Sequence, residues 1–291
     1  MNTPGQASSE DLPTPESMSV LQLMRDPMLP IPLHGFNNLS SGVKRRVYRL
    51  LIPPQLLTRF GIDPLSWRRE GMELVTLIAD AQSNHVRIVA RHTEDAPDPF
   101  YRLELADNAF NGIDVVLVVL SDPDGPRFQT DYTADGQETQ FGATHRNRSE
   151  EIRAMEAGLA PAQIRPGLRA SAEVFAALDL FLAAAGHESV YMDPLTYADA
   201  WLFEKRGCSY VQGRRLMERI HDEFQPGGAL HAALDSSTPF RLAGQWQTVR
   251  GRSWAIHDGI LEAIGESWNN IRMVKRVGYD AGIQTFPDAV Y

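Results

Sequence analysis

Residues 165–170 form the clearest candidate for chemistry, a turn placed directly before a predicted helix. The turn reads Arg165-Pro166-Gly167-Leu168-Arg169-Ala170. Backbone N–H groups at a helix N-terminus lie at the positive end of the helix dipole, so they bind phosphate groups without specific side chains. Gly167 allows a phosphate to approach the backbone closely, and Arg165 and Arg169 add positive charge. An ordinary structural turn explains the same residues, and both interpretations stay open.

The stretch from Gln163 to Gly213 supplies the elements that would position this turn. Apolar residues recur at helical spacing and predict an amphipathic helix that ends near Gly186: Val174, Leu178, Phe181, Leu182 and Ala185. A short strand is predicted at 190–192. Thr196 then caps a second helix, which ends at Gly207 before a strand at 208–212.

The first half of the chain is predicted to be β-rich and largely antiparallel. Strands are expected where residues alternate or are continuously apolar, at 73–79, 85–92, 100–105 and 113–120. The last of these is nearly all apolar and β-branched, which predicts a central strand buried on both faces. We also expect a strand at 47–52, a short helix beginning at Pro54 and a hairpin strand at 127–132.

Two further groups of residues could carry chemistry. The dipeptides His221-Asp222 and His257-Asp258 are of a kind that binds metal in some hydrolases, although hydrogen bonding at a surface or a helix cap explains them equally. Arg250 and Arg252 precede a predicted helix and could bind an anion or pair with surface acids. Cys208 falls in a predicted strand, which favours burial over a role as nucleophile.

Composition narrows the class of protein. The chain has 291 residues with 43% hydrophobic and 22% charged residues, which is ordinary globular usage. Its net charge of −9 argues against non-specific nucleic-acid binding, which needs a cationic surface. A single cysteine excludes an intrachain disulfide and suits a reducing cytoplasm. The sequence has no signal-peptide pattern and no apolar run that matches a bilayer span, so we expect a cytoplasmic protein that binds neither nucleic acid nor membrane.

The block from Gln163 to Gly213 resembles the second half of the Gcn5-related N-acetyltransferase (GNAT) fold. In that family a β-rich first half leads to a splayed central strand, and a glycine-containing loop opens a long helix. A strand, a helix and a final strand follow, and the run along the second helix has a small residue, a tyrosine, a basic residue and a Gly-Phe pair. The corresponding residues are Ala200, Phe203, Lys205, Gly207 and Cys208.

The resemblance implies an α/β fold with a GNAT-like mixed, mostly antiparallel sheet flanked by helices and followed by a helical C-terminal extension. Three ranges are expected. Residues 1–30, rich in Ser, Pro, Thr and acidic residues, form a disordered or loosely ordered tail. Residues 31–213 form the GNAT-like core, and residues 214–291 form the extension packed on that core.

The resemblance also implies ligands and roles. Acetyl-CoA or another acyl-CoA is the expected co-substrate, without a metal, and its pyrophosphate would lie at residues 165–170. Many members protonate the leaving thiolate with a tyrosine on the second helix, where this chain has Phe203. Tyr197 is therefore the candidate acid, with Tyr191 and Tyr210 as alternatives. The candidate general base is Glu104, and the alternatives are Asp107 and Asp114.

The implied function is acyl-CoA-dependent acyl transfer to a small-molecule or protein amine, with a backbone N–H stabilising the oxyanion. The alternative is a catalytically inactive protein of the same fold that binds a ligand or a protein partner. Phe203 favours this alternative, as does Gly167, which lies one position early in the loop. Homo-oligomerisation also stays open.

Overall fold

Seven strands form one mostly antiparallel sheet in the order β3-β4-β5-β6-β7-β9-β8, with helices along it. The structure is a computed structural model that describes residues 29–142 and 144–291, so nearly all of the predicted tail lies outside the described residues. The chain divides into two compact units. Unit 1 comprises the chain up to Leu120 with Arg169–Val190, and unit 2 comprises Ser121–Leu168 with Tyr191–Tyr291. The ranges 31–213 and 214–291 are a different division and stay predictions.

The strands of unit 1 form an antiparallel meander. They are β3 (Val75–Ile78), β4 (His85–Ala90), β5 (Tyr101–Asp107) and β6 (Ile113–Leu120). The four strands predicted before residue 121 are therefore confirmed. A separate two-stranded ribbon joins β1 (Arg68–Arg69) to β2 (Met72–Glu73).

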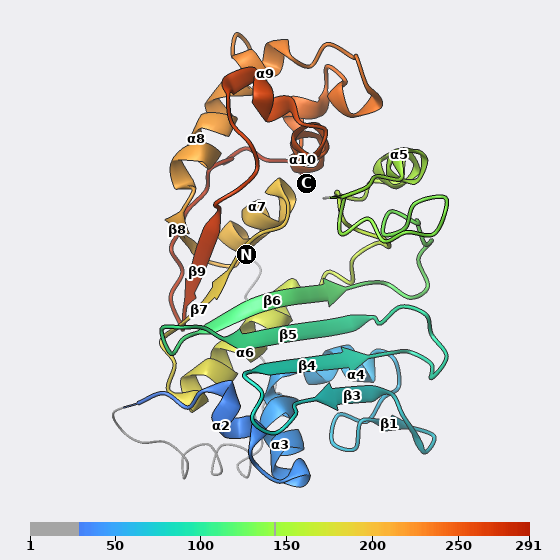
Figure 1. Cartoon of the computed structure of the whole chain (residues 1–291), viewed down its shortest axis with the longest axis vertical. Coiled ribbons are helices and arrows are strands. Elements are labelled where there is room, and N and C mark those ends of the chain that lie inside the picture. The colour runs from blue at the N-terminus through green and yellow to red at the C-terminus, as the bar shows by residue number, and fades with distance from the viewer. Residues whose placement is uncertain (1–28, 143) are drawn as a thin grey trace, which may run out of the picture. The chain divides into compact units, whose positions relative to one another are not determined.

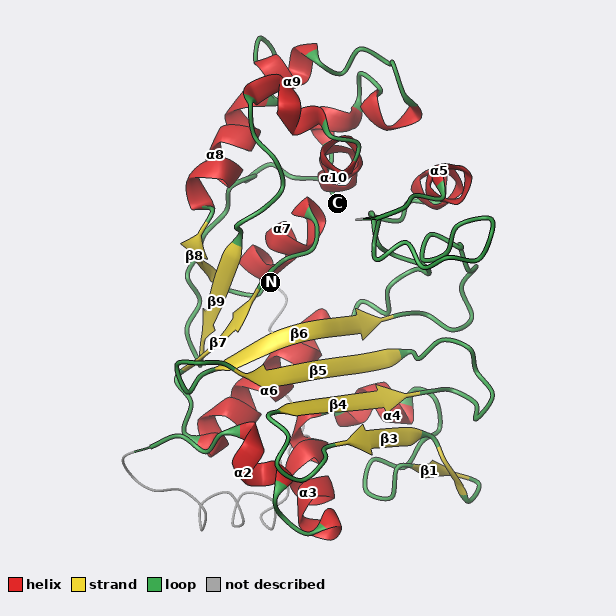
Figure 2. Cartoon of the chain, viewed as in Figure 1, coloured by secondary structure: helices red, strands yellow, loops and turns green. Residues whose placement is uncertain are grey.

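One face of this meander is covered by helices (Figures 1 and 2). The helical segments of unit 1 are α2 (Leu33–Asn37), α3 (Ser41–Tyr48), the 3-10 turn η1 (Arg49–Leu51), α4 (Pro54–Thr58) and α6 (Ser171–Ala185). The predicted apolar stripe of α6 is buried, and Gly186 ends the helix in the left-handed conformation with φ 84°. The aromatic rings of Phe36, Tyr48 and Phe181 pack together where α2, α3 and α6 meet.

The strand predicted at 47–52 is wrong, because α3 and η1 occupy these residues. Val47, Tyr48, Leu51 and Ile52 are buried, and their spacing suits one side of a helix as well as a strand. A short apolar run does not distinguish the two conformations by itself. Packing of the Tyr48 ring against the Phe181 ring, with 6.1 Å between ring centres, decides for the helix.

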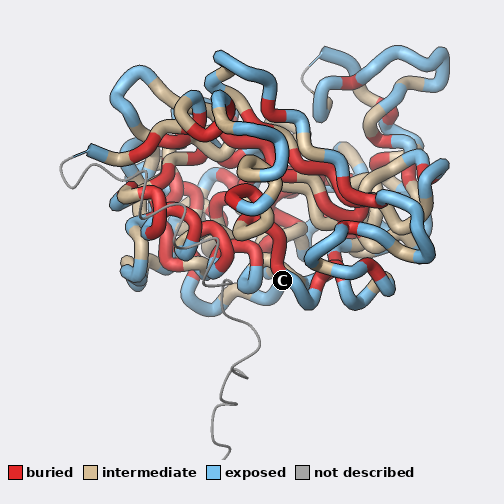
Figure 3. The backbone as a smooth tube through the Cα atoms, turned by 90° about the horizontal axis from the view of Figure 1, so that it is seen from below, coloured by how far each residue is buried: buried red, intermediate tan, exposed pale blue. Residues whose placement is uncertain are grey.

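Strand β6 forms as predicted but is not buried on both faces. Ile113 is fully buried, whereas Val116 is 55% exposed and most of the other residues are half-buried. An apolar, β-branched run predicts a strand without stating how many of its faces are covered. Figure 3 shows buried stretches of the chain on the inside and exposed stretches along many of the outer loops.

Unit 2 contains the remaining strands and helices. Its strands are β7 (Ser189–Met192), which begins in unit 1, β8 (Ser209–Gln212) and β9 (Arg272–Arg276). Its longer helices are α5 (Arg148–Glu156), α7 (Tyr197–Lys205), α8 (Arg214–Glu223) and α10 (Val249–His257). The short helical segments are α9 (Ala229–Ala232), η2 (Pro239–Arg241), η3 (Gln245–Gln247) and η4 (Ile260–Ile264).

The start and the end predicted for the second helix, which lies in unit 2, are confirmed. Thr196 caps α7 through a capping box with Asp199, and Gly207 follows the helix with φ 77°. Residues 214–291 contain α8, α9, α10 and three 3-10 segments joined by irregular chain, and they also provide β9, which pairs with β8. The strand predicted at 127–132 is wrong: this stretch is irregular because Phe128 turns into a core with Ala154, Leu159, Phe240 and Trp254. Within residues 29–142 and 144–291, no helix has both the length and the hydropathy to cross a bilayer.

The side chain of Asn37 joins α2 to the chain around β4, so a substitution at this position tests that packing. Its buried side chain donates to the carbonyl groups of Ser83 and His85 at 2.8 and 3.0 Å and accepts from Tyr48. The substitution Asn37→Leu leaves these buried groups short of partners, so we expect the free energy of unfolding to fall by about 2 to 3 kcal/mol in urea denaturation. Asn84→Ala, at an exposed neighbouring position, is the control and should cost less than about 0.5 kcal/mol. Equal effects of the two substitutions would contradict this account.

Candidate functional site

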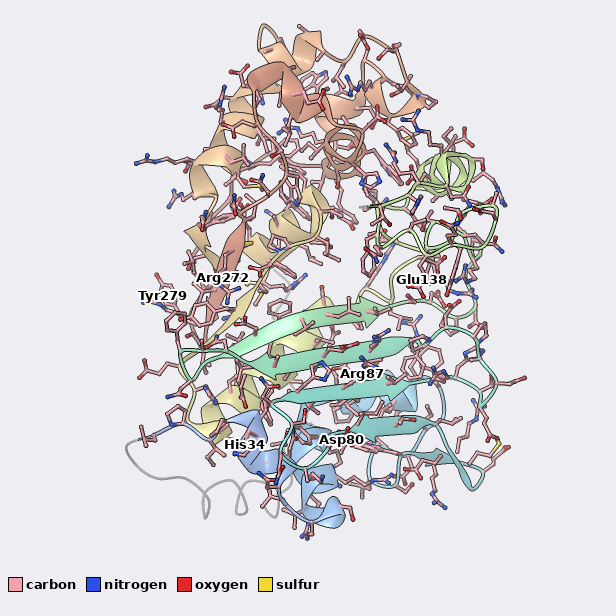
Figure 4. The ribbon with its side chains drawn as sticks, viewed as in Figure 1. His34, Asp80, Arg87, Glu138, Arg272 and Tyr279 are labelled. Atoms are coloured by element: carbon pink, nitrogen blue, oxygen red, sulfur yellow. The ribbon has the colours of Figure 1, made fainter. Side chains whose placement is uncertain are left out.

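The face of the unit 1 sheet opposite its helices carries a group of charged side chains. The register places Arg87 of β4, Glu104 of β5 and Leu117 of β6 directly across from one another. Side chains alternate along a strand, so His85 and Arg102 lie on this same face. The intervening residues are buried on the helix side. Arg87 is labelled on its strand in Figure 4. We call His85, Arg87, Arg102 and Glu104 the charged cluster.

Glu104 is the centre of the charged cluster. Its residue is only 5% exposed. One carboxylate oxygen, Oε1, accepts a hydrogen bond from Nε of Arg102 at 2.6 Å and lies 2.9 Å from Nε of Arg87. The other, Oε2, lies 3.1 Å from Nε2 of His85. Burial alone would raise the pKa of Glu104, but hydrogen bonds and charge from Arg102 and Arg87 outweigh it and lower the pKa.

This geometry bears on the predicted role of Glu104 as a general base. A carboxylate with a lowered pKa that already accepts from two guanidinium groups binds a further proton weakly. The arrangement favours a role in positioning Arg87 and Arg102. Of the alternative bases, Asp107 accepts from the backbone N–H groups of Leu33 and His34, and Asp114 accepts from Asn108. These contacts are structural.

A β-bulge lies beside the charged cluster. Glu104 pairs with Leu117 and Leu105 pairs with Val115, so Val116 is the extra residue of β6. The extra residue of a bulge is left out of the hydrogen-bond ladder. The residue is 55% exposed. The bulge therefore presents an exposed residue of β6 beside the charged cluster.

The residues of the predicted phosphate-binding turn differ in their contacts and in how far they are buried. Arg165 donates to the carbonyl group of Gly125 at 2.6 Å, which ties its guanidinium to the 122–126 turn. Gly167 is exposed and forms a backbone bridge with Ser121, while Leu168 is buried. Arg169 is exposed and has a left-handed backbone with φ 59°, which is uncommon for a residue with a side chain.

The N-terminus of α6 lacks a side-chain cap, which is a feature that favours anion binding. Ala170 occupies the cap position and no side chain caps the helix. Side chains of Asn147, Thr196 and Thr248 cap α5, α7 and α10 in unit 2, whereas α3, α4 and α8 resemble α6 in having no side-chain cap. The first N–H groups of α6 therefore lack the usual side-chain acceptor, although Glu173 in the first turn opposes a negatively charged ligand.

Tyr197, the predicted acid, is the first residue of α7 and is fully buried in unit 2. Burial raises its pKa to about 12, and the nearby Arg252 opposes the rise. In the described residues its hydroxyl has no partner in hydrogen-bonding geometry. The phenol thus stays protonated at neutral pH but is closed to solvent. Its role as an acid stays a prediction.

The alternative candidates for the acid, Tyr210 and Tyr191, also contact other side chains. Tyr210 donates to Glu204 at 2.6 Å, and Thr285 donates to the same carboxylate from its N–H and hydroxyl groups. Burial is the main cause that raises the pKa of both Glu204 and Tyr210. The Tyr191 ring lies under Arg272, with 5.3 Å to the ring centre. Phe203 is half-buried on α7.

The His-Asp dipeptides belong to hydrogen-bond and ion-pair networks. His257 lies 3.4 Å from Glu151, and Asp258 accepts from Arg146 and Arg241 at 3.1 Å each. His221 instead faces the guanidinium of Arg252. Across the part of the chain that the structure describes, no three His, Cys, Asp or Glu side chains are grouped as a metal site requires.

Unit 2 has a pocket of about 190 Å³ between α8 and the C-terminal segment. Its lining residues are Arg214, Glu218, His221, Asp222, Ile283, Gln284, Thr285 and Pro287. Behind His221, the buried Arg252 stacks on the ring of Phe286, 3.5 Å from its centre, and donates to the carbonyl group of Trp246. Aromatic rings stabilise this buried cation. The pocket mixes acidic, basic and apolar groups without a convergent reactive pair, so it is the weaker candidate.

The sequence patterns did not single out His85, Arg87 and Arg102. The signal was present as charges two residues apart, in His85-x-Arg87 and Arg102-x-Glu104. Period-two spacing predicts that each pair shares a face. The register between strands, which brings the two pairs together, follows from pairing with partners distant in the chain.

The ionised state of Glu104 gives a pH-dependent prediction. Because its folded pKa lies below the unfolded value of about 4.3, its ion pairs stabilise the fold above that pH and are lost as the pH falls through the lower folded pKa. Glu104→Gln should lower the free energy of unfolding by about 1 to 2 kcal/mol at pH 7, since both arginines are partly solvent-exposed. The loss should shrink at pH 3.

The control is Glu73→Gln, which removes the exposed ion pairs with Arg45 and Arg68. It should change stability by less than about 0.5 kcal/mol. Urea denaturation at both pH values measures the two effects. A loss for Glu104→Gln that is the same at pH 3 and pH 7 would show that the carboxylate charge is not what stabilises the cluster.

Comparison with known proteins identified no similar protein. No protein-family model matches the chain, no curated protein matches it, and no solved structure matches it. A functional assignment therefore depends on the residues and the fold.

Proposed function

We propose that the protein is an acyl-CoA-dependent acyltransferase that acts on an amine. The observation that carries the proposal is the order of elements. Four antiparallel strands end in the bulged β6, and after irregular chain and the short helix α5 the long helix α6 is followed by β7, α7 and β8. This is the order implied by the resemblance to the GNAT family. The sheet order, with β9 between β7 and β8, adds a further strand from residues 214–291.

Acyl-CoA recognition would use backbone groups. The N–H groups at the start of α6 lack a side-chain cap, and a pyrophosphate accepts hydrogen bonds from such groups. Gly167, exposed in the preceding turn, leaves room for close approach, and the exposed Arg169 adds charge. Arg165, Leu168 and Ala170 would shape the turn around the ligand.

The reaction would proceed at the thioester carbonyl. The acceptor nitrogen attacks the carbonyl carbon, a C–N bond forms and the C–S bond breaks. The nitrogen loses a proton and the CoA thiolate gains one. A backbone N–H of the β6 bulge at Val116 would donate to the oxyanion of the tetrahedral intermediate. Glu104 as base and Tyr197 as acid remain candidates for the two proton transfers, although their surroundings do not support either role.

The alternative is a protein of the same fold that binds acyl-CoA or a partner without catalysis. Phe203 cannot donate a proton to a thiolate, and the Tyr197 hydroxyl is closed to solvent. These two observations favour binding without transfer. Binding of acyl-CoA with no acylation of any amine would select this alternative.

Calorimetric titration with acetyl-CoA and longer acyl-CoAs tests the proposal. We expect a dissociation constant on the order of micromolar for the parent protein. Gly167→Asp places a carboxylate where the pyrophosphate should bind, so the affinity should fall at least about tenfold. The matched control is Gly244→Asp, because Gly244 has open space around it and φ −83°. No binding of any acyl-CoA by the parent would overturn the proposal.

A further inference from the structure

The charged cluster on unit 1 carries more positive than negative charge. Arg87 and Arg102 provide two guanidinium groups, and within the described residues Glu104 provides the carboxylate that pairs with both of them. His85 adds a ring nitrogen on the same carboxylate. This local excess occurs on a chain whose net charge is −9. A local excess of cationic groups produces a positive potential, and a positive potential stabilises a bound anion.

The cations of the charged cluster lie on the outside and the carboxylate lies on the inside. The side chains of Arg87 and Arg102 are 38% and 35% exposed, whereas that of Glu104 is 7% exposed. Glu104 therefore fixes the two guanidinium groups from beneath. Fixing them in advance reduces the conformational entropy that a ligand would otherwise have to remove.

Hydrogen-bonding capacity remains on both arginines. A guanidinium has five N–H donors, and within the described residues Glu104 is the side chain that both guanidinium groups contact. Nε of Arg87 lies 2.9 Å from the carboxylate and is buried, so the donors that Arg87 offers to a ligand are on its terminal nitrogens. Two adjacent arginines with free donors match the two oxygens of a carboxylate.

The charged cluster adjoins the proposed reaction centre. Glu104 pairs directly with Leu117, and Leu117 follows the bulge residue Val116. Neighbouring strands lie about 4.8 Å apart, so a ligand bound over Glu104 reaches the backbone of the bulge within the length of a small molecule. Val116 is 55% exposed, and Leu117 and Val119 are half-buried, which leaves apolar surface beside the charges.

We propose that Arg87 and Arg102 bind the carboxylate of the acceptor, so that the acceptor is an amine that also carries a carboxylate, as an amino acid does. This inference rests on the proposed acyl transfer. Glu104 is then a positioning residue that holds the two arginines. A phosphate of acyl-CoA has similar chemistry, but the uncapped helix α6 and the exposed Gly167 already supply a place for the CoA phosphates.

Direct binding of product-like probes tests the proposal and does not require the acceptor to be identified. Calorimetry is run with N-acetyl amino acids that have small or apolar side chains, and with the same compounds as neutral carboxamides. We expect saturable binding of at least one carboxylate at about millimolar affinity and at least tenfold weaker binding of its carboxamide. Absence of saturable binding by every carboxylate would overturn the proposal.

Variants then locate the site. Arg87→Gln and Arg102→Gln should each weaken carboxylate binding about tenfold or more and leave the dissociation constant of acetyl-CoA unchanged. Arg68→Gln, which removes another exposed arginine of unit 1, should change neither affinity. Thermal unfolding of each variant identifies any loss of fold, and Arg87→Lys retains the charge and should restore part of the binding.

The two proposals fail in different ways. If Arg87→Gln weakens acetyl-CoA rather than the carboxylate probe, the charged cluster binds a phosphate and the acceptor inference is overturned while acyl-CoA binding stands. If carboxylates bind at the cluster but no acyl-CoA binds, the acyltransferase proposal is overturned. Unchanged carboxylate affinity in both arginine variants would place the carboxylate elsewhere and overturn the inference.

Discussion

The structure of unit 1 depends on the burial of a single face of its antiparallel meander. Apolar side chains from β3 to β6 turn toward α2, α3, α4 and α6, and the burial of these side chains supplies the main stabilisation. The other face has no such cover from the helices of unit 1. The carboxylate of Glu104 is nearly buried at that face and needs compensating charge, which the partly exposed Arg87 and Arg102 supply. The same constraint therefore produces both the hydrophobic core and the charged cluster.

Unit 2 is stabilised differently, because much of it is irregular chain. Arg146 donates to both Glu151 and Asp258, and Arg241 donates to Asp258 as well. These ion pairs connect Arg146, which lies just before α5, to α5 itself and to Asp258 at the end of α10. The carboxylates of Glu151 and Asp258 are only a few per cent exposed, and without such partners their burial would lower the stability of the fold. The network therefore gives fixed positions to loops that have little regular backbone hydrogen bonding.

The proposed chemistry uses backbone groups more than side chains. The bulge of β6 and the uncapped start of α6 are properties of chain conformation, and neither demands a particular residue type. Side chains would then decide which acceptor is used, through the two arginines held by Glu104. A division of this kind keeps the acyl-CoA site separate from the determinants of acceptor specificity, so each can be altered alone.

The sequence by itself determined the local elements: the strands of the meander, the apolar stripe of α6, the cap at Thr196 and the helix end at Gly186. These follow from periodicity and from backbone preferences of single residues, which act over a few positions. Tertiary structure decided that residues 47–52 are largely helical and that most residues of β6 are only half-buried. It also joined His85, Arg87, Arg102 and Glu104 into one cluster, because strand register and burial depend on partners far apart in the chain.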